Sequence, residues 1–84
     1  MKLRTKNGRL TAYAFACGYV EQKHDDATNA STSLWVEHGA PHVRTITRDT
    51  AGNITSRDWQ AFDQGQLSEA RRAFNKKPGE IFNA

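Results

Sequence analysis

Alternation of apolar and polar positions along the chain predicts a short helix, an antiparallel sheet and a second helix. The first helix is expected over residues 10–17, where small and apolar side chains recur at helical spacing. Thr11 is suited to cap or begin it, and Gly18 is suited to end it. Three residues are expected on its apolar side, namely Leu10, Ala14 and Cys17.

The middle of the chain shows the period-two pattern of β-strands. Three strands are expected at residues 34–37, 42–48 and 54–62, preceded by a short extended segment at 19–24. A hairpin loop at 49–53 joins the last two strands. Trp59 and Phe62 cannot both face the core unless a bulge lies near residues 60–61.

The second helix is expected at residues 68–76, ended by Pro78 and Gly79. Its apolar stripe recurs at i, i+3, i+4 and i+7, on Leu67, Ala70, Arg71 and Phe74. Leu67 and Phe74 are therefore predicted to be core residues.

These elements predict one α+β domain spanning residues 1–84, because a chain of this length has room for a single core. The expected fold is a three- to four-stranded antiparallel sheet with an N-terminal and a C-terminal helix on one face. Three flanking segments are expected, namely a basic N-terminal segment at 1–9, a mobile loop at 25–33 and a C-terminal tail at 78–84 that docks through Ile81 and Phe82.

Charge and cysteine content narrow the classes of partner and compartment. The chain has 12 Lys and Arg against 9 Asp and Glu, giving a net charge of +3, which permits nucleic-acid binding without requiring it. A single cysteine cannot form an internal disulfide, so a reducing cytoplasm is expected. No apolar run is long enough to span a membrane, so no membrane partner is expected.

The residues that could bind a metal or catalyse a reaction do not form a recognised motif. His38 and His42 flank the first predicted hairpin turn, but paired cysteines are missing and Cys17 is expected to be a small buried thiol. Asp25 and Asp26 are expected to be a solvated loop pair. No nucleophile elbow or phosphate-binding glycine loop occurs. We therefore expect no enzyme activity, metal or cofactor.

A group of arginines and one tryptophan on the last two strands is the strongest functional candidate. Arg44 and Arg48 would share the sheet face opposite Val43, and Arg57 and Trp59 would share one face of the next strand. Arginine beside an aromatic ring suits contact with phosphates and bases. The plainer alternative is a solvated face with Trp59 in the core. The second candidate interface is the N-terminal segment, with Lys2, Arg4, Lys6 and Arg9.

Residues 34–74 resemble the AP2-type DNA-binding domain of plants and the arm-type DNA-binding domains of phage integrases. The resemblance rests on residues 43–49, 57–62 and 67–74, which read VRTITRD, RDWQAF and LSEARRAF. It implies three strands packed on one helix, with Arg57, Trp59 and either Arg44 or Arg48 facing DNA. The order helix, three strands, helix is also similar to double-stranded-RNA-binding domains.

Residues 2–6 and 10–21, together with 42–44 and 68–71, are similar to small uncharacterised proteins of tailed bacteriophages. That resemblance implies a protein made in the host cytoplasm during infection. Such accessory proteins often bind, inhibit or redirect host factors, including defence systems.

Two functions are therefore expected from the sequence. The first is a non-enzymatic nucleic-acid-binding module that contacts duplex DNA with the outer face of the sheet. The second is a phage accessory protein that binds and modulates a host protein. The oligomeric state, the choice between the sheet face and the N-terminal segment as the interface, and the exposure of Trp59 stay open.

Overall fold

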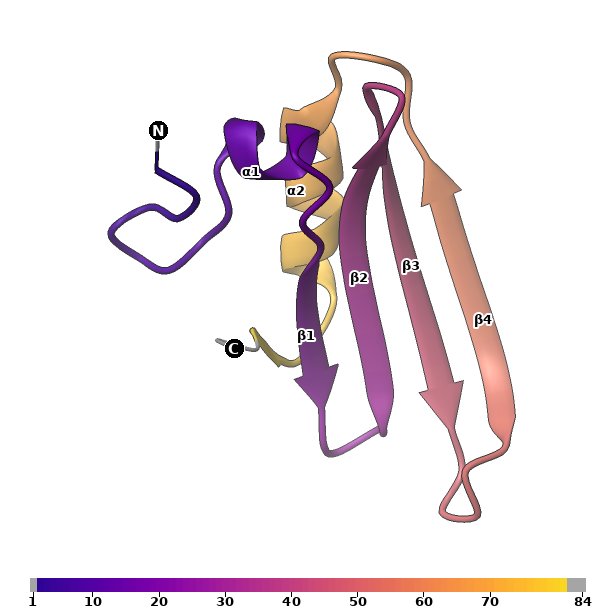
Figure 1. Cartoon of the computed structure of the whole chain (residues 1–84). Helices are drawn as coiled ribbons and strands as arrows, with labels where there is room; N and C mark the ends of the chain where they lie inside the picture. The colour runs from indigo at the N-terminus through magenta and orange to yellow at the C-terminus, as the bar shows by residue number, and fades with distance from the viewer. Residues whose placement is uncertain (1, 82–84) are drawn as a thin grey trace.

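A computed structural model describes residues 2–81 and has the α+β architecture that the sequence predicts (Figure 1). The order of its elements is α1 (Ala12–Ala16), β1 (Glu21–Asp25), β2 (Ala30–Glu37), β3 (Ala40–Arg48), β4 (Ile54–Ala61), α2 (Leu67–Lys76) and β5 (Glu80–Ile81). None of the helices in this part of the chain is long and apolar enough to cross a membrane.

The five strands form one antiparallel sheet in the order β4-β3-β2-β1-β5. This is more than the three to four strands expected, because Glu80 and Ile81 return and pair with β1. Lys23 lies opposite Ile81, which packs partly buried against the core. The predicted tail at 78–84 is thus a strand as far as Ile81, and Phe82 lies outside the described residues.

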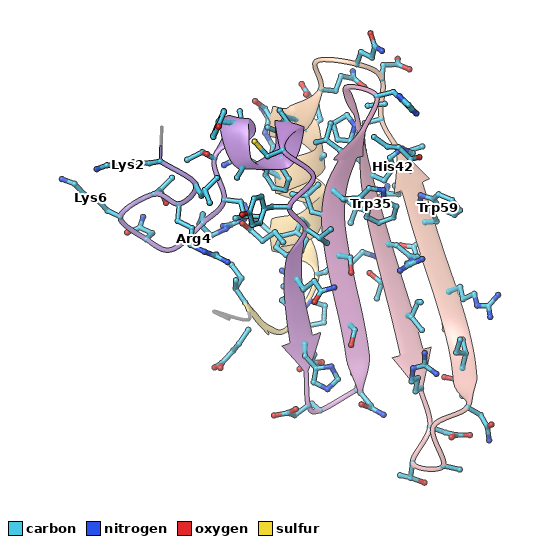
Figure 2. The ribbon with its side chains drawn as sticks, in the orientation of Figure 1. Lys2, Arg4, Lys6, Trp35, His42 and Trp59 are labelled. Carbon is cyan, nitrogen blue, oxygen red and sulfur yellow. The ribbon has the colours of Figure 1, made fainter. Side chains whose placement is uncertain are left out.

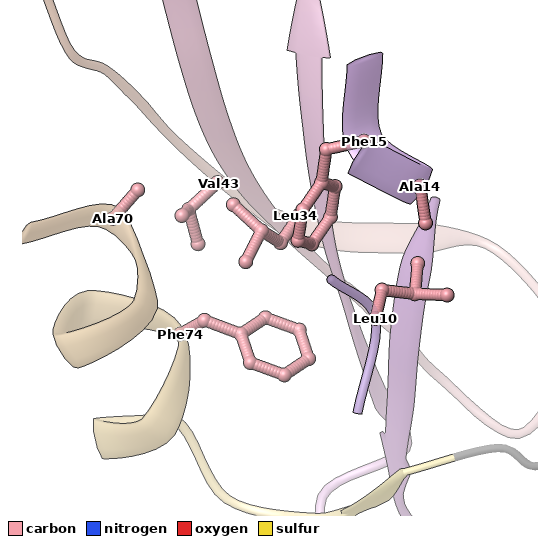
Figure 3. Packing of buried hydrophobic residues seen from close by; sticks show 7 residues of the cluster. All are labelled: Leu10, Ala14, Phe15, Leu34, Val43, Ala70 and Phe74. Carbon is pink, nitrogen blue, oxygen red and sulfur yellow. The ribbon is translucent and has the colours of Figure 1, made fainter. Parts of the chain in front are cut away.

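The core lies between the two helices and the central strands (Figure 3). β2 and β3 contribute Leu34 and Val43 from the same face of the sheet, because these two residues lie opposite each other in the ladder. Phe15 of α1 and Phe74 of α2 close over them, and both rings are almost fully buried. Phe74 is a core residue as predicted, whereas Leu67 is only partly buried at the margin.

Helix α1 is shorter than the predicted 10–17. The Thr11 hydroxyl accepts a hydrogen bond from the backbone N–H of Ala14, as expected for an N-cap, and Gly18 takes a φ of +94° just after the end. Phe15 is directed into the core, whereas Cys17 lies at the C-cap of the helix and is exposed. The prediction that Cys17 is a buried thiol was wrong.

Helix α2 matches its predicted range to within one residue. Arg71 lies on the apolar stripe, and its guanidinium donates to the Leu10 carbonyl and covers the Phe15 ring. Lys77 leaves the helix in an extended conformation, which the following proline requires.

The mobile loop predicted at 25–33 is largely strand. Only residues 26–29 form a turn, and β2 begins at Ala30. Thr32 is fully buried, and its hydroxyl lies 3.0 Å from the hydroxyl of Thr45 on β3. Pairing with β1 on one side and β3 on the other overrides the low strand propensity of this polar segment.

Candidate binding surface on the outer face of the sheet

The ladder between β3 and β4 decides which side chains share the face away from the helices. Val43 lies in the core, so its neighbour Arg44 must project from the other face, called the outer face below. Trp59 lies directly opposite Arg44 in the ladder, and Arg57 lies opposite Ile46. Arg44, Arg57 and Trp59 therefore share the outer face, which answers the question that the sequence left open about Trp59.

Two further residues join them. Trp35 and His42 are paired across β2 and β3 on the same face, and their rings stack with centroids 5.2 Å apart and planes at 13°. The Trp59 ring lies 6.2 Å from Trp35 and 5.9 Å from His42, so the three rings form one cluster (Figure 2). The Arg44 guanidinium lies 5.4 Å from the Trp35 ring centre, within cation–π range. The platform, as we name it, consists of Trp35, His42, Arg44, Arg57 and Trp59.

Hydrogen bonding fixes the orientation of the cluster. The Trp59 indole N–H donates to Nδ1 of His42 over 3.2 Å, so this nitrogen acts as an acceptor in the arrangement seen. The bond orients a side chain that remains 63% exposed. Trp59 is thus outside the core. Phe62 is three residues further along, points to the opposite face and packs against the core. No bulge is needed between them, and the ladder irregularity lies at Thr47 and Arg48 instead.

Arg48 does not belong to the platform. It follows the irregularity in the ladder, and its guanidinium donates to the Gly52 carbonyl over 3.0 Å. It therefore supports the hairpin loop at 49–53, four residues along β3 from Arg44. At about 3.3 Å per residue this separation is roughly 13 Å.

Two of the three acidic residues nearest to the platform are directed elsewhere. Asp58 projects from the helix side of β4, where its carboxylate pairs with Lys77 over 2.6 Å. Asp49 caps the hairpin loop by accepting from the backbone N–H groups of Ala51 and Asn53. Glu37 shares the outer face with Trp35, two residues away at the end of β2, where its one negative charge does not cancel those of the two arginines. The platform therefore keeps a positive local charge.

The N-terminal basic residues are separate from this surface. Figure 2 shows Lys2, Arg4 and Lys6 at the opposite side of the molecule from Trp59. Lys2 and Lys6 are exposed, and Arg4 donates to the Gly8 carbonyl within its own turn. Arg9 has a structural role instead.

The guanidinium of Arg9 bonds the buried carboxylate of Glu21 over 2.5 Å and the Asn75 side chain over 3.0 Å. These two contacts tie the N-terminal segment to β1 and α2. Arg9 is therefore not available as a ligand contact in the arrangement seen.

The candidate metal ligands do not come together. Within residues 2–81 no three His, Cys, Asp or Glu side chains gather around one point. His38 lies in the turn between β2 and β3 with a φ of +52°, while His42 stacks on Trp35. His24 lies at the far end of the sheet, 2.9 Å from the Ser31 hydroxyl and beside Asp26.

Trp35 and His42 are the candidate site residues that reasoning from the sequence missed. The signal was present in the turn, because the two-residue loop His38-Gly39 pairs Glu37 with Ala40. Moving two residues away from the turn along each strand then pairs Trp35 with His42 on one face. His42 lies two residues before Arg44 on β3 and therefore points to the same face, which the sequence had already assigned to Arg44. Trp35, its partner in the ladder, points to that face as well.

Comparisons with known proteins reveal no further relationship: no protein-family model, curated protein or solved structure gives a significant match to this chain.

Proposed function

We propose that the chain is a non-enzymatic nucleic-acid-binding module whose platform contacts bases and phosphates. The observation that carries the proposal is an exposed tryptophan held beside a second aromatic stack and two arginines on one sheet face. Exposed aromatic rings stack on bases, and arginines neutralise phosphates with release of counterions. Exposed arginines on a sheet contribute little to stability, so a ligand role accounts for their concentration there.

The geometry favours unpaired bases over the duplex DNA expected from the sequence. A base within a duplex is already stacked on its neighbours, whereas an unpaired base can lie on the exposed Trp59 ring. Four longer strands at about 4.8 Å spacing make a sheet about 14 Å wide, before side chains are added. This exceeds the major groove, which is about 12 Å wide. A single strand lying across the sheet avoids that limit.

Binding of labelled single strands and matched duplexes, measured by fluorescence anisotropy over a range of salt concentrations, tests the proposal. We expect single strands to bind more tightly, with an affinity that falls as salt rises. Replacing Arg44 and Arg57 together with alanine should reduce the slope of log K against log salt by about 1.4, since each phosphate contact contributes about 0.7 for single strands.

The matched control is the double replacement of Lys2 and Lys6 with alanine. It removes the same charge from the opposite side of the molecule, so it separates a local contact from a general effect of net charge. If the control variant loses binding and the Arg44 and Arg57 variant retains it, the N-terminal segment is the interface and the platform is a solvated face. Tighter binding of duplexes would reverse the preference for unpaired bases.

A second candidate function, modulation of a host protein, is favoured by the composition of the same surface. Tryptophan and arginine are the residue types that most often dominate the energy of protein interfaces. In that case neither single strands nor duplexes should bind at low salt, and binding of the partner protein should be lost when Trp59 is replaced. The anisotropy experiment therefore distinguishes the two candidates.

A further inference from the structure

Strand β4 is an edge strand, called the border of the sheet below, and it pairs with a neighbouring strand, β3, on one side only among the described residues. All eight of its residues are exposed, in contrast to β2 and β3, whose alternate residues are buried. Helix α2 packs over β2 and β3. Within residues 2–81 no strand pairs with the far side of β4. This border is visible at the right of Figure 1.

The ladder shows which backbone groups of β4 point away from the sheet. The N–H of Phe62 donates to the Pro41 carbonyl over 2.9 Å, which makes these two residues a hydrogen-bonded pair. Hydrogen-bonded and non-bonded pairs alternate in an antiparallel ladder. Gln60 and Asp58 therefore bond to β3, whereas the N–H and C=O groups of Trp59 and Arg57 are directed to the open border.

Of the usual protections against pairing with another strand, this edge has charged side chains and an irregularity near its start. Edges are otherwise shortened, covered or interrupted by proline, and none of these applies to residues 56–61 of β4. In β4 the irregularity lies at the start, near Ile54, and residues 56–61 pair regularly with β3. The charges of Arg57 and Asp58 project to opposite faces and leave the border itself open.

We propose that β4 pairs antiparallel with β4 of a second copy of this chain, about a two-fold axis that passes beside Asp58. In this register Arg57 of each copy lies opposite Trp59 of the other. All four residues direct their backbone groups toward the interface, and arginine beside indole is a favourable cross-strand pair. A shift by two residues in one direction would instead place Arg57 opposite Arg57.

Charge on the helix side fits the same register. The groove between β4 and α2, with a volume of about 460 Å³, is lined by three cationic side chains, Arg72, Lys76 and Lys77, and one acid, Glu69. Lys77 already pairs with Asp58 of its own chain. The remaining positive charge can offset the second Asp58 that the two-fold axis places opposite the first.

The two sheets would then form one continuous sheet with both platforms on the same side. The interface uses the same surface from each copy, so the assembly closes as a dimer and does not grow. Pairing would bring two sets of aromatic rings and arginines within reach of one extended ligand.

The proposal is tested without any ligand by light scattering coupled to size exclusion. We expect a mass of twice 9.4 kDa that falls toward a single chain on dilution. Arg57→Pro removes an outward N–H and should give a monomer at concentrations where the parent is a dimer. Proline is tolerated on an edge strand when its missing N–H faces solvent. Arg57→Ala, the matched control, keeps the N–H and should weaken dimerisation by less than about tenfold.

Amide hydrogen exchange on the parent protein gives an independent readout that does not depend on folding of the proline variant. The amides of Arg57 and Trp59 should exchange slowly in concentrated samples and quickly in dilute ones. A single-chain mass at every concentration, with fast exchange at both amides, would overturn the proposal. So would growth beyond a dimer, or a dimer in which both amides exchange quickly.

Discussion

Glu21 shows how a buried charge holds the N-terminal segment in place. Its carboxylate accepts hydrogen bonds from the Leu10 backbone N–H over 2.7 Å and from Arg9. Glu21→Ala leaves the buried Leu10 N–H without its acceptor, so we expect a loss of about 2–4 kcal/mol in the free energy of unfolding. Urea titration measures it, with the exposed Glu37→Ala as a control that should change little. Equal midpoints for the two variants would show that the contact is not stabilising.

Lys23 is a second buried charge, and its effect depends on pH. Its ammonium lies 4.5 Å from the centre of the Phe74 ring, and the residue is only 4% exposed. Burial, with a smaller contribution from Arg9, lowers the pKa of Lys23 below its usual 10.5, and Glu21 partly offsets this shift. The folded protein therefore binds this proton more weakly than the unfolded chain does.

Stability carried by Lys23 should consequently rise with pH as the ammonium loses its proton, up to the unfolded pKa of 10.5. We expect the free energy of unfolding of the parent to increase relative to that of Lys23→Met between pH 7 and the start of alkaline denaturation, about pH 10. Denaturant titrations of both proteins across this range check the sign. A constant difference would mean that Lys23 is not perturbed by folding.

At the scale of elements, Phe74 is the largest buried side chain by which α2 packs against the core. Phe74 has no exposed surface and contacts the core formed by Leu34, Val43 and Leu10. Phe74→Ala should lower the free energy of unfolding by about 3–5 kcal/mol, a large share of what a domain of this size has. Glu69→Ala, on the exposed side of the same helix, is the control. A thermal midpoint unchanged by Phe74→Ala would contradict the packing described.

The joining of β5 to β1 depends on a glycine at the turn after α2. Gly79 has a φ of +117°, and an added Cβ would lie 2.7 Å from the backbone carbonyl of His24. Gly18 also has a positive φ, but nothing lies within 4 Å of its Cβ position. Gly18→Ala should cost about 1 kcal/mol from backbone strain alone. Gly79→Ala should cost more, with faster amide exchange at Ile81. Equal losses would mean that β5 can shift without penalty.

The sequence predicted those elements whose side chains alternate between core and solvent, and missed those that depend on partners distant in the chain. Val43 and Phe74 lie in clear periodic patterns, and parity placed Arg44 opposite the core face and grouped Arg57 with Trp59, without deciding whether Trp59 is exposed. β5 has two residues, too few to show a period. The segment before Leu34 is polar and reads as a loop, because its strand conformation comes from pairing on both sides. A hairpin turn was predicted between His38 and His42, but its two-residue length, which pairs Trp35 with His42, was not recognised.

At the scale of the whole molecule, one face of the sheet carries the core and the other carries the proposed binding surface. The inner face carries Leu34 and Val43 in the core, while the outer face carries the platform, whose Trp59 is mostly exposed. A substitution on either face should therefore affect one property and spare the other.

Trp59→Ala should change the free energy of unfolding by less than about 1 kcal/mol, because little of the ring is buried. Removing the ring on which one base stacks should nevertheless weaken single-strand binding by about 1–3 kcal/mol, or roughly 5- to 150-fold. Leu34→Ala should do the reverse, with a loss of about 2–5 kcal/mol in stability and an unchanged affinity per folded molecule. Urea titration and anisotropy on the same preparations measure both quantities. If Trp59→Ala destabilises the fold as much as Leu34→Ala does, the outer aromatic cluster stabilises the fold like a second core, which would contradict a role of Trp59 in ligand binding alone.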